Sequence, residues 1–348
     1  MKIGVYCHRL DRTGAPIMLN RLARHLAKAH TVELLLPALP PGPLLAEYEK
    51  AGIAARHGAV PQEYDAFILN TLISGELVVR MAGMVPTLYW VHEPRGGLPF
   101  LTSGRSDPRA FALADRVVFP TRWQADTLFK PYLTRDNWEV VPYGIGTDPT
   151  PRPCPFEKKP GKLYLVQLGM LTLRKGHDVT MRALAELDNP DIEVFLCGGS
   201  DVEPEFAARV RAFVEAHPRL RHTVHFLGSV PEETVNAYLQ HCDAMIFPTR
   251  DDLITLSILE AMFFGCCVIS SDFGPIPETV KDMDSGLLFP VEDFRAMARA
   301  IDRVFQDRGL LRRIGAAGRV RYDECHSFEA HAAGMERVLR AIARPGAR

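Results

Sequence analysis

Two adjacent cationic side chains, Arg174 and Lys175, stand in the segment LGMLTLRKGHD at 168–178. An apolar run ends just before them, and Gly176 opens a stretch with the length of a helix. Positive side chains at a helix N-terminus suit a phosphate, because charge and unpaired backbone amides converge there. The same pattern also fits a solvated charge pair, and both interpretations are open on this segment alone.

Three carboxylates, Asp251, Asp252 and Glu260, bracket the start of an apolar helical segment in PTRDDLITLSILEAMFFG at 248–265. Carboxylates at a strand end and on the first turns of a helix can accept hydrogen bonds from the hydroxyls of a sugar or ribose. Acidic residues near a helix N-terminus also complement the helix dipole, so a purely structural role is the alternative.

The first half of the chain contributes a glycine turn and a histidine. Gly14 lies in TGAP, between an apolar run and a helical segment, where glycine allows an anion to approach the backbone amides. His92 lies in WVHEP at the end of another apolar run, where its side chain would face a crevice. A simple tight turn and a structural histidine are the alternatives.

All of these segments follow short apolar runs that alternate with amphipathic stretches. Near-continuous apolar strands with intervening helices indicate parallel sheets covered on both faces, and ligands bind beyond the carboxyl ends of such strands. The predicted strands cover 2–6, 32–36, 65–69, 87–91 and 116–119 in the first half, and 162–169, 192–197, 223–228, 243–247, 266–271 and 286–289 in the second.

This rhythm predicts an α/β protein of two doubly wound domains, at 1–150 and 162–325. The length of 348 residues, at about 150 residues per domain, agrees with two. We interpret 151–161 as a proline-rich linker, because proline disfavours helix and interrupts ladder hydrogen bonds. The sequence is helical after 290, and we expect 326–348 to form a terminal helix that packs back on the N-terminal domain.

Composition disfavours several classes of protein. Lys and Arg number 41 against 42 Asp and Glu, so no overall basic field is available to bind nucleic acid. The seven cysteines are scattered and show no CxxC spacing, which argues against zinc and against disulfides and favours a reducing cytoplasm. No apolar run approaches the roughly 18 residues of a membrane span, and the N-terminus shows no signal-peptide pattern.

Taken together, these segments resemble the family 4 retaining glycosyltransferases of the group 1 type, which have the GT-B fold of two facing Rossmann-like domains. The resemblance covers nearly the whole chain and is most specific over 163–290. In the first half, TGAP, WVHEP, ADRVVFPTRWQ and VVPYGI are similar to the family's glycine turn, strand-end histidine, hinge-proximal helix and exit strand. In the second half, the segments occur in the same order as the family's motifs: LGM, RKG, FLGSVP, CDAMIFPT, LEAMFFG, CCVISSDFGPIPE and DSGLLFP.

The resemblance implies a role for each matching residue. Lys175 would neutralise the leaving diphosphate of a nucleotide sugar, and Glu260 would hold the ribose hydroxyls. His92 would face the transferred sugar, and Gly14 would lie close to the donor phosphates.

The sequence departs from the family at several of these motifs. Asp252 stands where the E-x7-E motif usually begins with Glu, so its carboxylate is one methylene shorter, and Asp251 could share its task. The other departures are Leu253, Ile254 and Thr255 in place of Gly-Phe-Gly, Met170 in place of an Arg that Arg174 could replace, and Tyr143 in place of the Asn of the exit motif.

The resemblance implies a retaining transfer of a hexose-type sugar from a nucleotide-diphosphate donor to a glycan, lipid-linked or small-molecule acceptor. No cofactor is expected besides this co-substrate, and no metal, because the D-x-D at 282–284 fits a turn better than a metal site. The expected catalytic residues are His92, Lys175 and Asp252, and the expected donor-binding residues are Gly14, Arg174, Lys175, Asp251, Asp252, Leu253, Ile254, Thr255 and Glu260.

Other functions remain open. A catalytically silent nucleotide-sugar-binding subunit would account for the Asp252 and Met170 departures, and a sugar-nucleotide epimerase shares the two-domain architecture. A dinucleotide-dependent oxidoreductase is disfavoured, because no GxGxxG is present.

A helical segment at 17–29 raises the question of a membrane. Its basic residues Arg21, Arg24, His25 and Lys28 lie beside an apolar stripe, and such a helix could touch an anionic membrane that carries a lipid-linked acceptor. The alternative is a helix with a solvated basic edge. We therefore expect a cytoplasmic protein, with peripheral contact at the inner face of the membrane as an open option.

Overall fold

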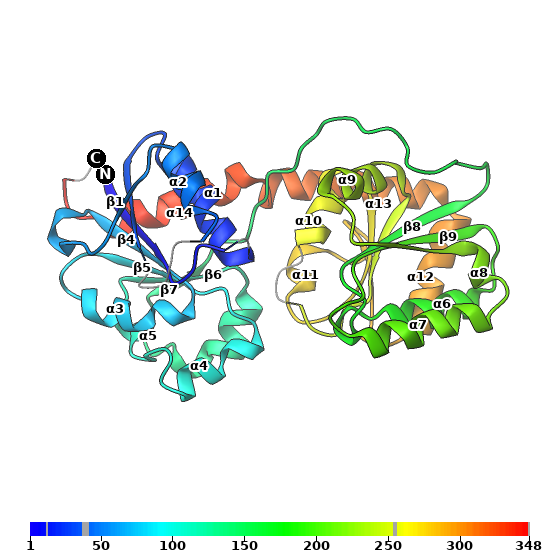
Figure 1. Ribbon diagram of the computed structural model, residues 1–348, viewed down its shortest axis with the longest axis horizontal. Helices are drawn as coiled ribbons and strands as arrows, with labels where there is room; N and C mark the ends of the chain where they lie inside the picture. The colour runs from blue at the N-terminus through cyan, green and yellow to red at the C-terminus, as the bar shows by residue number, and fades with distance from the viewer. Residues whose placement is uncertain (12, 37–41, 253–255, 347–348) are drawn as a thin grey trace. The chain divides into compact units, whose positions relative to one another are not determined.

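The computed structural model describes residues 1–11, 13–36, 42–252 and 256–346, which form two α/β units (Figure 1). The first unit comprises Met1–Tyr143 and Glu329–Arg348, and the second comprises Gly144–Phe328. Each unit contains one parallel sheet flanked by helices, so the expected pair of Rossmann-like sheets is confirmed.

The sheet of the first unit has the strand order β3-β2-β1-β4-β5-β6-β7, and all its pairs are parallel. The strands are β1 Lys2–Cys7, β2 Thr31–Leu35, β3 Ala54–Arg56, β4 Ala66–Asn70, β5 Thr87–Trp90, β6 Arg116–Phe119 and β7 Trp138–Val140. The α-helices are α1 Gly14–Leu26, α2 Leu45–Lys50, α3 Gly75–Met81, α4 Pro99–Thr102, α5 Ala110–Leu113 and α14 Phe328–Ile342. Short 3-10 or π helices lie at η1 Pro61–Glu63, η2 Leu72–Ser74, η3 Arg95–Gly97, η4 Gln124–Phe129 and η5 Lys130–Tyr132.

The central strands of this sheet are buried along their whole length. β4 reads AFILN and β5 reads TLYW, and each of these residues is buried. Apolar side chains on both faces are typical of a parallel strand with helices packed on either side. The polar residues at the carboxyl ends, Asn70 and His92, are exceptions in this apolar pattern.

The sheet of the second unit has the order β10-β9-β8-β11-β12-β13, again all parallel. Its strands are β8 Leu163–Leu168, β9 Ile192–Cys197, β10 Val224–Gly228, β11 Ala244–Phe247, β12 Cys267–Ser271 and β13 Leu287–Phe289. Its helices are η6 Leu173–Lys175, α6 His177–Leu187, α7 Pro204–Ala216, α8 Leu220–Thr223, α9 Glu232–His241, α10 Leu256–Phe263, α11 Ile276–Thr279, α12 Phe294–Gln306 and α13 Arg308–Cys325.

Two aspartates define where the last helices of this unit begin. The side chain of Asp293 accepts a hydrogen bond from the backbone N–H of Ala296 at 2.8 Å and caps α12. Asp307 accepts one from Leu310 at 2.8 Å and caps α13. A side-chain cap satisfies a backbone donor that the helix itself leaves unpaired, so each Asp starts a new helix.

The C-terminal helix α14 packs on the first unit. Met335, Val338 and Leu339 are fully buried. His331 bonds the carbonyl oxygen of Pro142 through Nδ1 at 2.8 Å. Gly334 lies so close to β7 and its exit that a Cβ there would stand 2.9 Å from a methyl group of Val141.

The division between the units falls between Tyr143 and Gly144, before the expected boundary at 150. The proline-rich segment belongs to the second unit. The backbone N–H of Arg152 donates to Oε1 of Gln240 at 2.8 Å, and the Phe156 ring stacks on Phe195 with centroids 4.6 Å apart. A segment whose amide and aromatic groups find partners in one unit is part of that unit and is not a free spacer.

The apolar stripe of α1 is used inside the first unit. Met18, Leu19, Leu22 and Leu26 are buried in its core, while Arg24 and Lys28 are exposed. This burial favours the solvated basic edge over a membrane-inserted face. Within the described ranges, no helix is both long and apolar enough to cross a lipid bilayer.

Candidate functional site

The turn after β8 brings a lysine to the carboxyl edge of the second sheet. Gly169 has a φ of +126° and Gly176 a φ of +69°, and both conformations favour glycine. A Cβ on Gly176 would overlap the carbonyl oxygen of Pro248. A Cβ on Gly169 would stand 3.3 Å from the side chain of Lys175, so that side chain lies directly against the glycine backbone.

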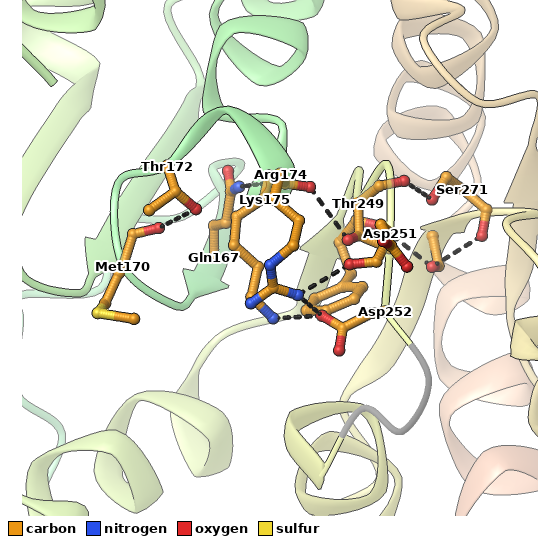
Figure 2. A network of polar contacts seen from close by, with 11 residues as sticks. Gln167, Met170, Thr172, Arg174, Lys175, Thr249, Asp251, Asp252 and Ser271 are labelled. Atoms are coloured by element: carbon orange, nitrogen blue, oxygen red, sulfur yellow. Dashed lines mark hydrogen bonds and ion pairs between the residues drawn. The ribbon is translucent and has the colours of Figure 1, made fainter. Parts of the chain in front are cut away.

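Lys175 and Arg174 converge on one carboxylate oxygen (Figure 2). Nζ of Lys175 donates to Oδ2 of Asp252, and the Arg174 guanidinium donates to the same oxygen at 2.9 Å. Arg174 also donates to the backbone oxygen of Asp251 at 2.8 Å. The structure thus brings together four of the expected donor-binding residues, two cations and two aspartates.

The pair of Lys175 and Asp252 is largely shielded from solvent. Their side chains are 14% and 13% exposed, whereas that of Arg174 is 45% exposed. The Lys175 ammonium also lies 4.7 Å from the centre of the Phe247 ring. Burial lowers the pKa of Lys175 and the charge of Arg174 lowers it further, while Asp252 acts in the opposite direction. The Asp252 carboxylate is therefore the group that favours the charged form of this lysine.

Backbone contacts hold the turn in place. The carbonyl oxygen of Arg174 accepts from the backbone N–H of Arg250 at 2.8 Å and from the Thr249 hydroxyl at 3.2 Å. The carbonyl oxygen of Lys175 accepts from Nε2 of Gln167 at 3.0 Å, and Gln167 in turn accepts from Thr180 at 2.7 Å. These contacts tie the turn to β8, to α6 and to the segment after β11.

Arg250 is a further residue of this site that our sequence analysis did not identify. Its guanidinium donates to both carboxylate oxygens of Asp178, at 2.9 and 2.8 Å, and to the carbonyl oxygen of Leu173 at 2.6 Å. A third partner is Glu292, at 2.7 Å, and the carboxylates of Asp178 and Glu292 raise the pKa of Arg250. The signal in the sequence was one cation next to the two aspartates of PTRDD, together with an Asp in RKGHD.

Four more of the expected donor-binding residues fall between positions 253 and 260, in α10 or just before it in the sequence. Glu260 is half-buried in this helix. Leu253, Ile254 and Thr255, which replace the family's Gly-Phe-Gly, lie outside the described residues.

Gly14 and His92 belong to the first unit and are linked through Asn70. Gly14 is the first residue of α1, and the space where its Cβ would be is open to 4 Å. Nε2 of His92 bonds Oδ1 of Asn70, and Nδ2 of Asn70 donates to the carbonyl oxygen of Ala15 at 3.1 Å. The histidine and the glycine turn are therefore two ends of one hydrogen-bonded chain.

His92 itself is enclosed by aromatic rings. Trp90 lies with its centroid 4.4 Å away, and Tyr143 stacks on His92 at 5.5 Å. Burial lowers the pKa of His92 well below its ordinary value, and His331 adds to the effect, so the imidazole is neutral. The Tyr143 ring, which stands where the family has Asn, covers the residue that we expected to face the sugar.

Three further polar residues share this edge of the first sheet. Thr71, directly after β4, has a φ of +75° and bonds Nδ1 of His8 through its hydroxyl at 2.8 Å. Such a φ in a β-branched residue indicates backbone strain, which is common at functional sites. Glu93 accepts from the backbone N–H groups of Leu72 at 2.7 Å and His92 at 3.0 Å, and burial raises its pKa to about 7.

No cluster of three or more His, Cys, Asp or Glu side chains suited to a metal ion occurs among the residues that the structure describes. The positive charge at the Arg174–Lys175 turn is that of the guanidinium and ammonium groups of these two side chains. What the arrangement can do chemically is bind an anion at the second sheet and accept hydrogen bonds from hydroxyl groups nearby.

Solved structures of low sequence identity share this fold. HepE of Anabaena in complex with UDP superposes with a TM-score of 0.75 at 17% identity, covering 98% of this chain and 100% of that chain. A glycosyltransferase from Rickettsia africae gives 0.73 at 16% identity, covering 98% of each. Sucrose-phosphate synthase of Thermosynechococcus elongatus gives 0.69 at 20% identity, again covering 98% of each. The fold is GT-B.

Residues 155–321, nearly all of the second unit, match the family described as Glycosyl transferases group 1, and the resemblance to that family is confirmed. An alpha-maltose-1-phosphate synthase of Mycolicibacterium smegmatis is 28% identical over 72% of this chain and 69% of its own length. The D-rhamnosyltransferase WbpZ of Pseudomonas aeruginosa is 27% identical over 60% of this chain and 54% of its own. A D-inositol 3-phosphate glycosyltransferase of Nocardia farcinica is 28% identical over 74% and 62%.

Proposed function

We propose that the protein is a retaining glycosyltransferase that moves a hexose-type sugar from a nucleotide-diphosphate donor to a hydroxyl of a glycan, lipid-linked or small-molecule acceptor. The observation that carries the proposal is the convergence of Arg174 and Lys175 at the carboxyl edge of the second sheet. That edge is where ligands bind in open parallel sheets. The names of the relatives, a maltose-1-phosphate synthase, a rhamnosyltransferase and an inositol-phosphate glycosyltransferase, support sugar transfer.

The donor is bound by the second unit in this proposal. Lys175 and Arg174 bind the diphosphate, because charge-assisted hydrogen bonds to phosphate are among the strongest that side chains make. Glu260 accepts hydrogen bonds from the ribose hydroxyls, and Asp251 and Asp252 accept from hydroxyls of the sugar. Gly14 and His92, which lie in the first unit, keep the roles that the family resemblance implies for them.

The chemistry is a front-face displacement in which the anomeric carbon keeps its configuration. The bond from this carbon to the leaving diphosphate oxygen breaks while its bond to the acceptor oxygen forms on the same face. The proton of the acceptor hydroxyl goes to the leaving phosphate oxygen. Lys175 and Arg174 stabilise the charge that develops there, the kind of preorganised electrostatic effect that often dominates catalysis, and no metal is required.

A donor panel tests the proposal. The protein is incubated with UDP-, GDP- and ADP-sugars and a mixture of sugar acceptors, and released nucleoside diphosphate and glycosylated products are measured, with the anomeric configuration read by NMR. We expect transfer with retention from at least one donor. Interconversion of the donor sugar without an acceptor would favour an epimerase instead.

A silent nucleotide-sugar-binding subunit is a second candidate, and one observation favours it. Tyr143 covers His92, so one of the residues expected to contact the sugar is shielded in the structure. Binding of a sugar nucleotide without turnover, whatever the acceptor, would support this alternative and exclude the transferase.

A further inference from the structure

The cations that should bind the donor's diphosphate already have an anionic partner. Oδ2 of Asp252 accepts from both Lys175 and Arg174, as an oxygen of a phosphate would (Figure 2). Carboxylate and phosphate oxygens accept charge-assisted hydrogen bonds in the same way. Asp252 therefore occupies, from within the chain, a place that suits a ligand's phosphate.

The position of Lys175 is constrained on several sides. Its side chain lies against Gly169 and over the Phe247 ring, and its carbonyl oxygen is held by Gln167. The neighbouring Arg174 is fixed through its carbonyl oxygen by Arg250. These contacts leave the Lys175 side chain little room to move when an anion binds. The Asp252 carboxylate is therefore the group that must move away from the cations.

We propose that Asp252 is a specificity residue that makes the site bind a sugar nucleotide in preference to the bare nucleoside diphosphate. This inference rests on the proposed function. Any diphosphate must displace the Asp252 carboxylate from Lys175 and Arg174 or lie next to it, and like charges side by side are unfavourable. With a sugar nucleotide, the displaced carboxylate finds a new partner in a sugar hydroxyl. The bare diphosphate lacks that hydroxyl, so no new hydrogen bond compensates the carboxylate for its lost contacts with Lys175 and Arg174.

This role reverses the effect expected of one substitution. If Asp252 contacted only the sugar, Asp252→Asn would leave the affinity for a bare nucleotide unchanged. If Asp252 competes with phosphate for two cations, Asp252→Asn binds the bare nucleotide more tightly. The sign of the change therefore separates the two roles.

The experiment is calorimetric titration of the parent protein and Asp252→Asn with UDP, GDP, ADP, inorganic pyrophosphate and the matching sugar nucleotides. We expect Asp252→Asn to bind the preferred nucleoside diphosphate, and pyrophosphate, about tenfold more tightly than the parent. The reason is that phosphate no longer has to replace a charge-assisted contact between the Asp252 carboxylate and the two cations. The ratio of the affinity for the sugar nucleotide to the affinity for the nucleoside diphosphate should be lower in Asp252→Asn than in the parent by at least the same factor.

Asp188→Asn is the matched control, because it removes the same formal charge from another Asp–Arg ion pair of the second unit. Asp188 pairs with Arg219 at 3.0 Å near the start of β9, away from the carboxyl edge. We expect a change of less than about threefold, attributable to the net charge alone. In the Lys175→Met background, Asp252→Asn should increase the affinity for pyrophosphate and for the bare nucleotide by a smaller factor than it does in the parent protein.

Asp252→Ser is a second variant in case Asn alters the local fold, and the melting temperature with and without pyrophosphate gives an independent measurement. Pyrophosphate should raise the melting temperature of either Asp252 variant more than that of the parent. Unchanged or weaker nucleotide binding by both variants, while the parent binds its nucleotide, would overturn the inference and leave the transferase intact. Failure of the parent to bind any nucleotide or sugar nucleotide would overturn both.

Discussion

Arg250 and Asp178 form a two-point ion pair, with N–O distances of 2.9 and 2.8 Å, across the carboxyl edge of the second sheet. Arg250 follows β11, and Asp178 is in the first turn of α6. The pair therefore joins the two segments that supply the cations and the carboxylates of the site. The planar guanidinium matches a carboxylate at two points, which a lysine ammonium does not do.

We predict that Arg250→Lys weakens binding of the nucleoside diphosphate about tenfold. One contact of the two-point pair is lost, and the Arg174–Lys175 turn is then less firmly fixed to the segment after β11. Calorimetric titration measures the change. Asp178→Asn should have a similar effect, and the double variant should lose less than the sum of the two.

Arg219→Lys is a suitable control for this prediction. Arg219 pairs with Asp188 at 3.0 Å near the start of β9, away from the carboxyl edge. Its substitution should leave nucleotide affinity unchanged. Parental affinity in Arg250→Lys would show that the ion pair does not position the site.

We predict that Lys175→Ala impairs turnover far more than folding. The ammonium is held at the strand-to-helix turn where it meets the leaving diphosphate, and one charge-assisted hydrogen bond is worth about 1.5–3 kcal/mol, or roughly 10- to 150-fold in rate or affinity. Steady-state kinetics and a thermal melt of the variant measure both effects.

Lys162→Ala provides the comparison for Lys175→Ala within the same unit. Lys162 also forms an ion pair, with Glu193, but it precedes β8, whereas Lys175 follows that strand. A comparable change in stability with parental kinetics is expected there. Unchanged kinetics in Lys175→Ala would remove this lysine from the mechanism.

Glu260→Gln should weaken binding of the bare nucleoside diphosphate and of the sugar nucleotide alike, by ~1–3 kcal/mol, because one acceptor oxygen becomes a donor while the ribose is present in both ligands. The change has the opposite sign to that expected for Asp252→Asn with the bare nucleotide. Titration of the two variants side by side checks it. Equal binding by parent and Glu260→Gln would mean that the ribose is held elsewhere.

Transfer should proceed in excess EDTA. The diphosphate charge is met by Arg174 and Lys175 in the proposed mechanism, so chelation should leave the initial rate unchanged. Initial rates with EDTA, and with EDTA followed by excess Mg²⁺ or Mn²⁺, measure this. Loss of turnover on chelation and its recovery with metal would contradict the metal-free mechanism.

Glu93 should make the protein less stable as the pH rises from about 4.5 to about 7. Burial raises its pKa to about 7 in the folded state, above its ordinary value, so between these values the folded state binds a proton that the unfolded state has lost. The free energy of unfolding of the parent, relative to Glu93→Gln, should fall on the order of 2 kcal/mol over this range. Denaturant titrations at several pH values measure it, and a difference that is constant with pH would contradict the assignment.

Most strands could be predicted because their apolar runs are continuous. β6 and β9 have the predicted bounds, and β8 differs by one residue at each end. β3 was missed, and β7 was matched only through the exit strand VVPYGI, which begins at the last residue of β7. Each of the two strands has three residues, and neither is fully buried. A short strand at or near a sheet edge carries little apolar pattern, so nothing in the local sequence distinguishes it from a loop.

The site could be predicted in part for a related reason. Lys175 and Asp252 were identified from motifs, but their direct pairing is a tertiary contact between segments 77 positions apart. The same holds for Arg250, whose partners come from three separate segments. The shielding of His92 depends on Tyr143, a residue that was noted only as a departure from the family motif.

The position of α14 has a consequence for the order in which the protein can fold during synthesis. Met335, Val338 and Leu339 complete the core of the first unit, yet they leave the ribosome only after the whole second unit has been made. Until then, the surface around Trp90 and Tyr143 lacks the His331 ring that packs against it. The second unit can therefore reach its native state first, and the unit that begins the chain is the last to be finished.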